Sequence, residues 1–223
     1  MERGMIEAVA PVRAVRRAYD LHSLYYGWLV APLERKPRMR ALDVAAIQPD
    51  ERVLEVAVGP GLTFVEVLKR VHRTNTVEGV DLSPKMLERT RRLAISTGFR
   101  HFRLQEADAR RLPFDDATFD VLLNSYMLDL IPLDDLPVIL AEFKRVLKPG
   151  GRLVLVNMSK ERGEVRTLWE RLYERMPAQV VPYLFGSCRP VLIEQLARSS
   201  GFDQVQREFL GGLFQSEIVM GRA

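Results

Sequence analysis

Apolar residues in this chain follow two periods that alternate along its length. Five short runs are rich in apolar and β-branched residues, at positions 53–58, 76–80, 100–105, 119–123 and 152–157. Between these runs, apolar residues recur at steps of three and four, as in the stretch from Leu136 to Leu147. The first pattern is typical of strands covered on both faces, and the second of amphipathic helices. Their alternation predicts a doubly wound α/β domain around a parallel sheet with right-handed crossovers.

Residues at the ends of the periodic segments support this interpretation. Ser83 and Pro84 precede apolar residues at helical spacing, which resembles a helix cap followed by proline in the first turn. After residue 200 the alternation of strand and helix stops. Two strand-like runs, 202–210 and 216–223, follow each other and are joined by a short glycine-containing loop. That loop has no room for a crossover helix, so this pair should be antiparallel. We therefore expect seven strands, mostly parallel, with an antiparallel C-terminal hairpin.

Composition places the chain among ordinary globular proteins. Of its 223 residues, 47% are hydrophobic and 28% are charged, which suits a single domain with a sizeable core. The formal net charge is +4, but the basic residues are spread out without interleaved aromatics, so nucleic acid is not an expected partner. The single cysteine, Cys188, excludes an intrachain disulfide and favours a reducing, cytoplasmic setting. No apolar run reaches the roughly 18 residues of a membrane span.

A glycine turn and an acid mark the predicted ligand site. The run 53–58 carries one acid, Glu55, and breaks into a Gly-Pro-Gly turn at 59–61. In open parallel sheets, ligands bind beyond the carboxyl ends of the strands, where this turn lies. Asp81 ends the next run, at the spacing where nucleotide-binding folds place an acid that accepts hydrogen bonds from the ribose hydroxyls. Because Phe64 replaces the third glycine of a dinucleotide fingerprint and the turn has no basic residue, we expect an adenosine end without phosphate.

Four segments together resemble one enzyme family. They are "VLEVAVGPG", "VEGVDLSPKML", "EADARRLPFDDATFDVLLNSYMLDLI" and "LKPGGRLVLV", in the order and spacing of class I S-adenosylmethionine-dependent methyltransferases. The resemblance covers residues 50–158 and implies a Rossmann-like fold with S-adenosylmethionine as the cofactor. The chain departs from the family at Ala57, where glycine is usual. The extra methyl group should crowd the turn and shift or weaken cofactor binding.

The resemblance also implies which residues contact the cofactor. Glu55 and the turn lie at the methionyl part, with Glu55 near its amino group. Asp81 holds the ribose, while Asp108 and the backbone of Ala109 meet the adenine amino group. Asn124 lies below the sulfonium. The full expected set is Tyr19, Glu55, Ala57, Gly59, Pro60, Gly61, Asp81, Leu82, Met86, Asp108, Ala109 and Asn124.

Methyl transfer from S-adenosylmethionine requires neither a protein nucleophile nor a metal. It is an in-line displacement on an activated carbon, so most of the barrier reduction comes from alignment and exclusion of water. The histidines are scattered without ligand-like spacing, and no metal is expected. The candidate positioning residues at the reacting centre are Tyr19, Tyr126 and Tyr183.

The segment before the core is a predicted amphipathic helix with a basic face. Apolar residues across 12–33 fall at steps of three and four, and Gly27 and Pro32 should break the helix late. The other side carries Arg13, Arg16 and Arg17. Two interpretations stand, a lid that closes the site and a membrane-surface element that collects a lipid acceptor. The stretch around Tyr19 resembles quinone C-methyltransferases and soluble bacterial phosphatidylethanolamine N-methyltransferases, in which the tyrosine lies over the cofactor.

A second variable segment, 160–190, lies between the fifth strand and the last helix. Its first part has apolar residues at helical spacing, and its second part is an irregular apolar loop. In this fold the region roofs the acceptor pocket, so Tyr183, Phe185 and Arg189 are candidates for acceptor contacts. Asp129, which follows the fourth strand, is a further candidate acceptor-side residue. An ordinary packed loop with a solvated Arg189 is the alternative.

The combined prediction is a single domain over 1–223. Its sections are an N-terminal helical lid, a cofactor-binding core, an acceptor-side insertion with a helix, and a C-terminal hairpin, at 1–45, 46–158, 159–200 and 201–223. We expect methyl transfer to a small, lipid-soluble acceptor, either a quinone ring or a phospholipid amine. The alternatives are a nicotinamide-dependent oxidoreductase and a non-catalytic cofactor-binding module. The expected location is cytoplasmic, with peripheral contact at the inner membrane surface if the N-terminal helix is a membrane element.

Overall fold

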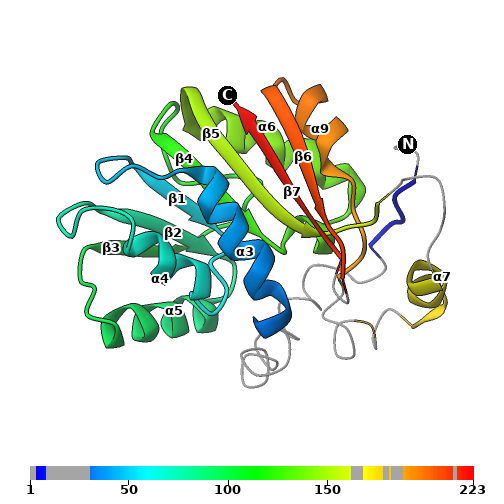
Figure 1. Ribbon diagram of the computed structural model, residues 1–223, viewed down its shortest axis with the longest axis horizontal. Helices are drawn as coiled ribbons and strands as arrows, with labels where there is room; N and C mark the ends of the chain where they lie inside the picture. The colour runs from blue at the N-terminus through cyan, green and yellow to red at the C-terminus, as the bar shows by residue number, and fades with distance from the viewer. Residues whose placement is uncertain (1–3, 9–30, 162–167, 178–180, 182–187, 213–214) are drawn as a thin grey trace.

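A seven-stranded sheet of order β3-β2-β1-β4-β5-β7-β6 organises the molecule. The computed structural model describes residues 4–8, 31–161, 168–177, 181, 188–212 and 215–223. The strands are β1 (Val53–Val56), β2 (Val77–Asp81), β3 (Phe102–Glu106), β4 (Phe119–Ser125), β5 (Leu147–Met158), β6 (Asp203–Leu210) and β7 (Ser216–Arg222). The first five run parallel, whereas β7 pairs antiparallel with both β5 and β6. The predicted α/β sheet with its antiparallel C-terminal hairpin is confirmed (Figure 1).

Helices cover both faces of the sheet (Figure 1). One face packs against α3 (Ala31–Ala45), α4 (Leu62–Leu68) and α5 (Pro84–Ser96), and the other against α6 (Leu136–Val146) and α9 (Ile193–Ser199). Successive strand residues turn to opposite faces, so Val53 belongs to the first core and Leu54 to the second. The other described helices are α7 (Leu168–Arg175) and the 3₁₀ turns η1 (Leu128–Leu130) and η2 (Leu133–Asp135). Among the described helices, none combines the length and hydropathy that a membrane span requires.

The predicted start of α5 is confirmed, and β5 is longer than predicted. The Ser83 hydroxyl accepts a hydrogen bond from the backbone N–H of Met86 at 3.2 Å, and Pro84 follows in the first turn. Proline is tolerated there because its missing N–H would have no partner within the helix. β5 begins at Leu147, which pairs with Phe119 before a register shift, rather than at residue 152.

Helix α3 begins at Ala31 and contains two prolines, while the segment 9–30 of the predicted amphipathic helix lies outside the described residues. Pro32 lies in the first turn of α3, and Pro37 lies inside the helix. The helix persists because Ala41, Leu42 and Ala45 are buried against the sheet, and this packing outweighs the hydrogen bond that Pro37 cannot donate. As a result, α3 extends along the sheet and its N-terminal half reaches the carboxyl ends of the strands (Figure 1).

Candidate functional site

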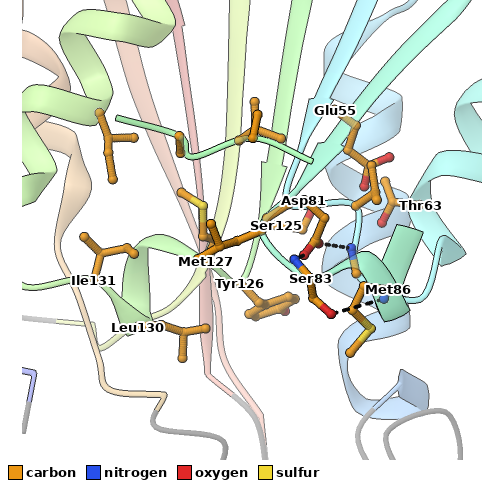
Figure 2. Close-up of a pocket in the computed structure, with 18 of the residues that line it drawn as sticks. Glu55, Thr63, Asp81, Ser83, Met86, Ser125, Tyr126, Met127, Leu130 and Ile131 are labelled. Carbon is orange, nitrogen blue, oxygen red and sulfur yellow. Dashed lines mark hydrogen bonds between the residues drawn. The ribbon is translucent and has the colours of Figure 1, made fainter. Parts of the chain in front are cut away.

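A cavity opens at the carboxyl ends of β1, β2 and β4, and Figure 2 shows residues that line it. The strand order reverses direction here, because β1 has β2 on one side and β4 on the other. Open α/β sheets bind ligands at such a switch point. Most of the predicted cofactor residues line the cavity, namely Glu55, Ala57, Gly59, Pro60, Asp81, Leu82, Met86, Asp108 and Ala109.

Asp81 ties two loops of the cavity together. Its Oδ2 accepts a hydrogen bond from the backbone N–H of Gly59 at 2.9 Å, and its Oδ1 accepts one from Ser83 at 2.8 Å (Figure 2). The carboxylate therefore fixes the turn after β1 against the loop after β2. Each carboxylate oxygen has a second lone pair, so Asp81 can also accept hydrogen bonds from ligand hydroxyls.

Gly61 has a packing role and does not line the cavity. Its φ is 85°, and a Cβ at this position would lie 2.8 Å from the Cα of Thr90 on α5. The Thr90 hydroxyl also donates a hydrogen bond to the carbonyl oxygen of Gly59 at 2.8 Å. Glycine at 61 thus allows the turn to approach α5 closely.

Ala57 lies in the cavity wall in a left-handed backbone conformation, with φ of 58°. For a residue with a Cβ this conformation costs roughly 1–2 kcal/mol, whereas glycine adopts it freely. The backbone geometry therefore explains why glycine suits this position and why alanine here is strained.

The Glu55 carboxyl lines the cavity beneath the turn and is only 1% exposed. Among the described residues, its Oε2 has no hydrogen-bond partner. Burial raises the pKa of Glu55 well above its usual value; Arg38 opposes this shift, while Asp81 adds to it. A buried carboxyl with an open acceptor atom suits a ligand that brings a cation or a hydrogen-bond donor.

Two charged residues of α3, which were not predicted from the sequence, complete this part of the cavity. Glu34 and Arg38 form an ion pair with Nη1 and Oε2 at 2.9 Å, and both side chains line the cavity. Both are buried. Their spacing of four residues was a signal, because such residues face each other on a helix. The prolines around them had argued against a helix here.

The cavity wall nearer α6 is charged at its rim. Arg110 Nη2 lies 2.6 Å from Asp108 Oδ2, and Arg110 Nη1 lies 3.2 Å from Asp135 Oδ2. All three side chains line the cavity, together with Ala109 and Ile139. The hydrogen bonds from the Arg110 side chain lower the pKa of Asp108, so this carboxyl stays ionised at neutral pH.

Tyr126, rather than Asn124, forms the wall after β4. Asn124 is fully buried and its Nδ2 donates to the Val56 carbonyl at 2.8 Å, away from the cavity lining. Tyr126 lines the cavity with a φ of 53°, which is rare for an aromatic residue. Its N–H donates to the Val156 carbonyl at 2.7 Å, and its phenol oxygen lies 2.9 Å from Ser216 Oγ. Burial raises the pKa of Tyr126, so its hydroxyl stays protonated.

Arg189 is fully buried, so the alternative of a solvated Arg189 is wrong. Its guanidinium donates to the carbonyl oxygens of Ile6 at 2.7 Å, Asp129 at 2.9 Å and Ile131 at 2.6 Å. The Asp129 carboxylate accepts a hydrogen bond from the Met158 N–H at 3.0 Å, and burial raises its pKa to about 7. Neither Arg189 nor Asp129 lines the cavity, whereas Ile131 does.

Several predicted residues lie outside the described part of the chain. They are Tyr19, Tyr183 and Phe185, with the basic face at Arg13, Arg16 and Arg17. Their roles, and the acceptor-side role of Asp129 and Arg189, stay predictions.

Comparisons with known proteins identify relatives that are methyltransferases. A family model described as "Methyltransferase domain" matches residues 53–151. A phosphatidylethanolamine N-methyltransferase from Cereibacter sphaeroides is 33% identical over 162 residues, which cover 71% of this chain and 75% of that protein. A ubiquinone/menaquinone biosynthesis C-methyltransferase from Teredinibacter turnerae is 31% identical over 144 residues, which cover 64% of this chain and 56% of that protein.

One solved structure illustrates the likeness in fold. Phosphoethanolamine N-methyltransferase 2 of Haemonchus contortus, in complex with S-adenosyl-L-methionine, matches with a TM-score of 0.66 at 14% identity. The match covers 84% of this chain and 52% of that one. Among the curated relatives that the chain matches, the matched part spans between 52% and 80% of their length.

Proposed function

Because the chain belongs to the class I S-adenosylmethionine-dependent methyltransferases, we propose that the cavity at β1, β2 and β4 holds S-adenosylmethionine beside a small, lipid-soluble methyl acceptor. The observation that carries this assignment is the pair of acids at the switch point. Asp81 ends β2 with both oxygens at the cavity edge, and Glu55 presents a buried, open acceptor atom beneath the turn.

The polar groups along the cavity suit the parts of this cofactor. The Glu55 carboxyl would hold the amino group of the methionyl part, and the Arg38 guanidinium would hold its carboxylate. Asp81 would accept from the ribose hydroxyls, and Asp108 with the backbone of Ala109 would meet the adenine amino group. When bound, the cofactor supplies an electrophilic methyl group on a sulfonium.

The chain's own contribution to the transfer is positioning. Tyr126 is held by the Val156 carbonyl, by the Ser216 hydroxyl and by its left-handed backbone, so its ring has one defined place on the cavity wall. A fixed ring can keep the acceptor in line and exclude water, which supplies most of the rate enhancement in such a displacement. Tyr19 and Tyr183 are proposed for the same kind of role.

A nicotinamide dinucleotide suits the site less well. Phe64 occupies the position at which a dinucleotide fingerprint has its third glycine, and it is fully buried. Its ring packs edge-on against Phe102 with centroids 5.9 Å apart, so a core contact depends on it. The residues of the turn itself, 57–63, carry no basic side chain to meet a pyrophosphate.

A non-catalytic binding module would bind the cofactor as an enzyme does and would differ only in turnover, so turnover with a labelled methyl donor distinguishes the two.

We favour a lipid-soluble acceptor on two grounds. The relatives named above are, by their names, a phosphatidylethanolamine N-methyltransferase and a ubiquinone/menaquinone biosynthesis C-methyltransferase. In this chain, the apolar side chains of Met127, Leu130 and Ile131 line the cavity beside Tyr126. Such a wall suits an apolar acceptor more than a charged one.

We further propose a peripheral membrane contact that gives access to such an acceptor. The predicted basic face at Arg13, Arg16 and Arg17 leads into α3, whose first turns expose Leu33, Arg35 and Lys36. Apolar and basic side chains together suit an anionic lipid surface, and each basic residue near it adds about 1 kcal/mol. Wild-type protein should therefore sediment with anionic vesicles at low salt and be released as salt rises. Protein that stays in the supernatant at low salt would rule out the contact.

Calorimetry with Asp81 variants tests the cofactor site. Asp81→Ala should weaken S-adenosylmethionine binding about 10- to 100-fold, because hydrogen bonds to a charged group contribute about 1.5–3 kcal/mol. Asp50→Ala, at an exposed acid, is the matched control and should bind as wild type does. Unchanged affinity in folded Asp81→Ala would contradict the ribose assignment, and tighter binding of a nicotinamide dinucleotide would contradict the cofactor.

Turnover with a labelled methyl donor tests the acceptor. Demethylated quinols and phosphatidylethanolamine vesicles are each offered, and mass spectrometry locates the label on carbon, nitrogen or oxygen. We expect label in one of the two lipid-soluble substrates. Label only in water-soluble compounds of a cell extract would contradict the proposed acceptor class, and tight cofactor binding without any labelled product would favour a binding module.

A further inference from the structure

Arg110 is a cavity-lining residue that links two separate loops. Its Nε lies 3.1 Å and 3.2 Å from the two carboxylate oxygens of Asp108, and its Nη2 lies 2.6 Å from Oδ2. Its backbone N–H also donates to Asp108 Oδ1 at 2.9 Å. The remaining terminal nitrogen, Nη1, donates to Asp135 Oδ2 at 3.2 Å.

The two acids come from different parts of the fold. Asp108 follows β3, whereas Asp135 is the last residue of η2 and immediately precedes α6. Both acids, Arg110 and Ile139 of α6 line the same part of the cavity. The bridge from Asp108 through Arg110 to Asp135 therefore spans the cavity rim where the proposed function places adenine.

We propose that Arg110 is a positioning residue that closes the adenine end of the cavity, and that breaking its bond to Asp135 is a step in cofactor and product release. We call the three residues Asp108, Arg110 and Asp135 the clasp. This inference rests on the proposed function, because it takes the cavity wall at Asp108 as the adenine site.

The two halves of the clasp differ in strength, which decides where it opens. Asp108 holds Arg110 through several hydrogen bonds, including a forked contact, while Asp135 holds it through one. Forked arginine–carboxylate contacts are stronger and better oriented than single ones. Arg110 should therefore stay with Asp108 and separate from Asp135.

Partial exposure makes this opening easy and sensitive to salt. The Arg110 side chain is 42% exposed and that of Asp135 is 29% exposed. A single ion pair of this kind is weak and is screened by dissolved ions. The contact is thus strong enough to slow the departure of a ligand and weak enough to break in every turnover.

The test is the dissociation rate of S-adenosylhomocysteine, measured by stopped-flow displacement over a salt series. Asp135→Asn should raise the rate about two- to fivefold, the size expected for one partly exposed ion pair, and should flatten its salt dependence. Arg110→Gln should raise the rate at least as much, because it removes the link from both acids. Asp134→Asn changes the same charge at the exposed neighbouring residue and should behave as wild type does.

Each outcome decides between the inference and its premise. Faster release in Asp135→Asn but not in Asp134→Asn supports the clasp. Equal rates and equal salt slopes in wild type, Asp135→Asn and Asp134→Asn overturn the clasp while the cofactor assignment stands. Wild-type protein that binds neither S-adenosylhomocysteine nor S-adenosylmethionine overturns the cofactor assignment and the clasp with it.

Discussion

At the scale of single residues, substitution of Ala57, which has a left-handed backbone conformation, can distinguish relief of backbone strain from a change in ligand contact. Ala57→Gly should raise the free energy of unfolding by about 1 kcal/mol, because it relieves a strain of roughly 1–2 kcal/mol against an entropy cost of about 0.5–1 kcal/mol for glycine. The affinity for S-adenosylmethionine should hold or increase, since the bare turn leaves more room. Urea denaturation gives the first quantity and calorimetry the second.

Ala117 is the matched control for this substitution. It has a φ of 50° and lies exposed in the loop before β4, away from the cavity lining. Ala117→Gly should therefore stabilise the protein to a similar extent without changing cofactor affinity. A large loss of affinity in Ala57→Gly, with the fold intact, would mean that the methyl group is itself a cofactor contact.

At the scale of elements, Arg189 joins its own segment to two others that are distant in the sequence, one at Ile6 and one at Asp129–Ile131. Its buried guanidinium holds the carbonyl oxygens of Ile6, Asp129 and Ile131. Arg189→Ala should lower the free energy of unfolding by at least about 3 kcal/mol, because hydrogen bonds to charged groups contribute about 1.5–3 kcal/mol each. Urea denaturation measures the loss.

Arg92→Ala provides the comparison on an exposed helix face. Arg92 is 76% exposed and pairs with Glu88 one turn away on α5, a kind of pair that contributes only about 0.3–0.5 kcal/mol. Arg189→Ala should thus be far more destabilising than Arg92→Ala. Equal stability of the two variants would show that the three carbonyl contacts are replaced by water without cost.

The elements that the sequence predicted well are those whose pattern comes from burial alone. Buried parallel strands give short apolar runs wherever they lie, so β1, β2 and β4 were located from those runs. The start of β5 was missed because Pro149 and the two glycines after it are turn signals, and they lie at a register shift between the pairs Phe119–Leu147 and Val121–Arg152, where Gly150 has a φ of 76°. Helix α3 was missed because proline argues against helix locally, and only tertiary packing shows the opposite.

Residues of the candidate site were predictable where they lie at the carboxyl ends of parallel strands. Glu55 and Asp81 belong to strands whose carboxyl ends must meet at one edge, so both were expected there and both line the cavity. Asn124 was expected in the wall, but the next residue of β4, Ser125, lines the cavity together with Tyr126, because each step along a strand turns the side chain to the other face. Arg38 comes from a helix outside the motifs, and no local pattern brings it to the cavity.

At the scale of the whole molecule, Asp129 should make stability depend on pH. Burial raises its pKa from 3.8 to about 7, so folding favours the protonated carboxyl. Its contribution is fully present below about pH 4 and is lost as the pH rises through about 7. Asp129→Asn keeps an oxygen for the Met158 N–H and removes the charge. The variant should exceed wild type in free energy of unfolding by a few kcal/mol at most at pH 8, since one unit of pKa shift corresponds to about 1.4 kcal/mol.

Urea denaturation of both proteins from pH 4 to pH 8 measures this effect. The two curves should meet near pH 4 and separate as the pH rises, while Asp50→Asn, at an exposed acid, serves as the control for charge removal. A constant difference between wild type and Asp129→Asn across the range would show that Asp129 ionises equally easily in the folded and unfolded chain.

The position of β7 between β5 and β6 has a consequence for how the protein is made. β6 is translated before β7 but has its strand partner only in β7, and the outer edge of β5 also pairs with β7. On the ribosome, both strands therefore present open edges until β7 leaves the exit tunnel, and open edges of this kind pair with other chains or recruit chaperones. Ser216, whose hydroxyl holds Tyr126, is the first residue of β7. The pairing of β7 therefore completes the sheet and fixes the Tyr126 wall of the cavity in the same step, late in synthesis.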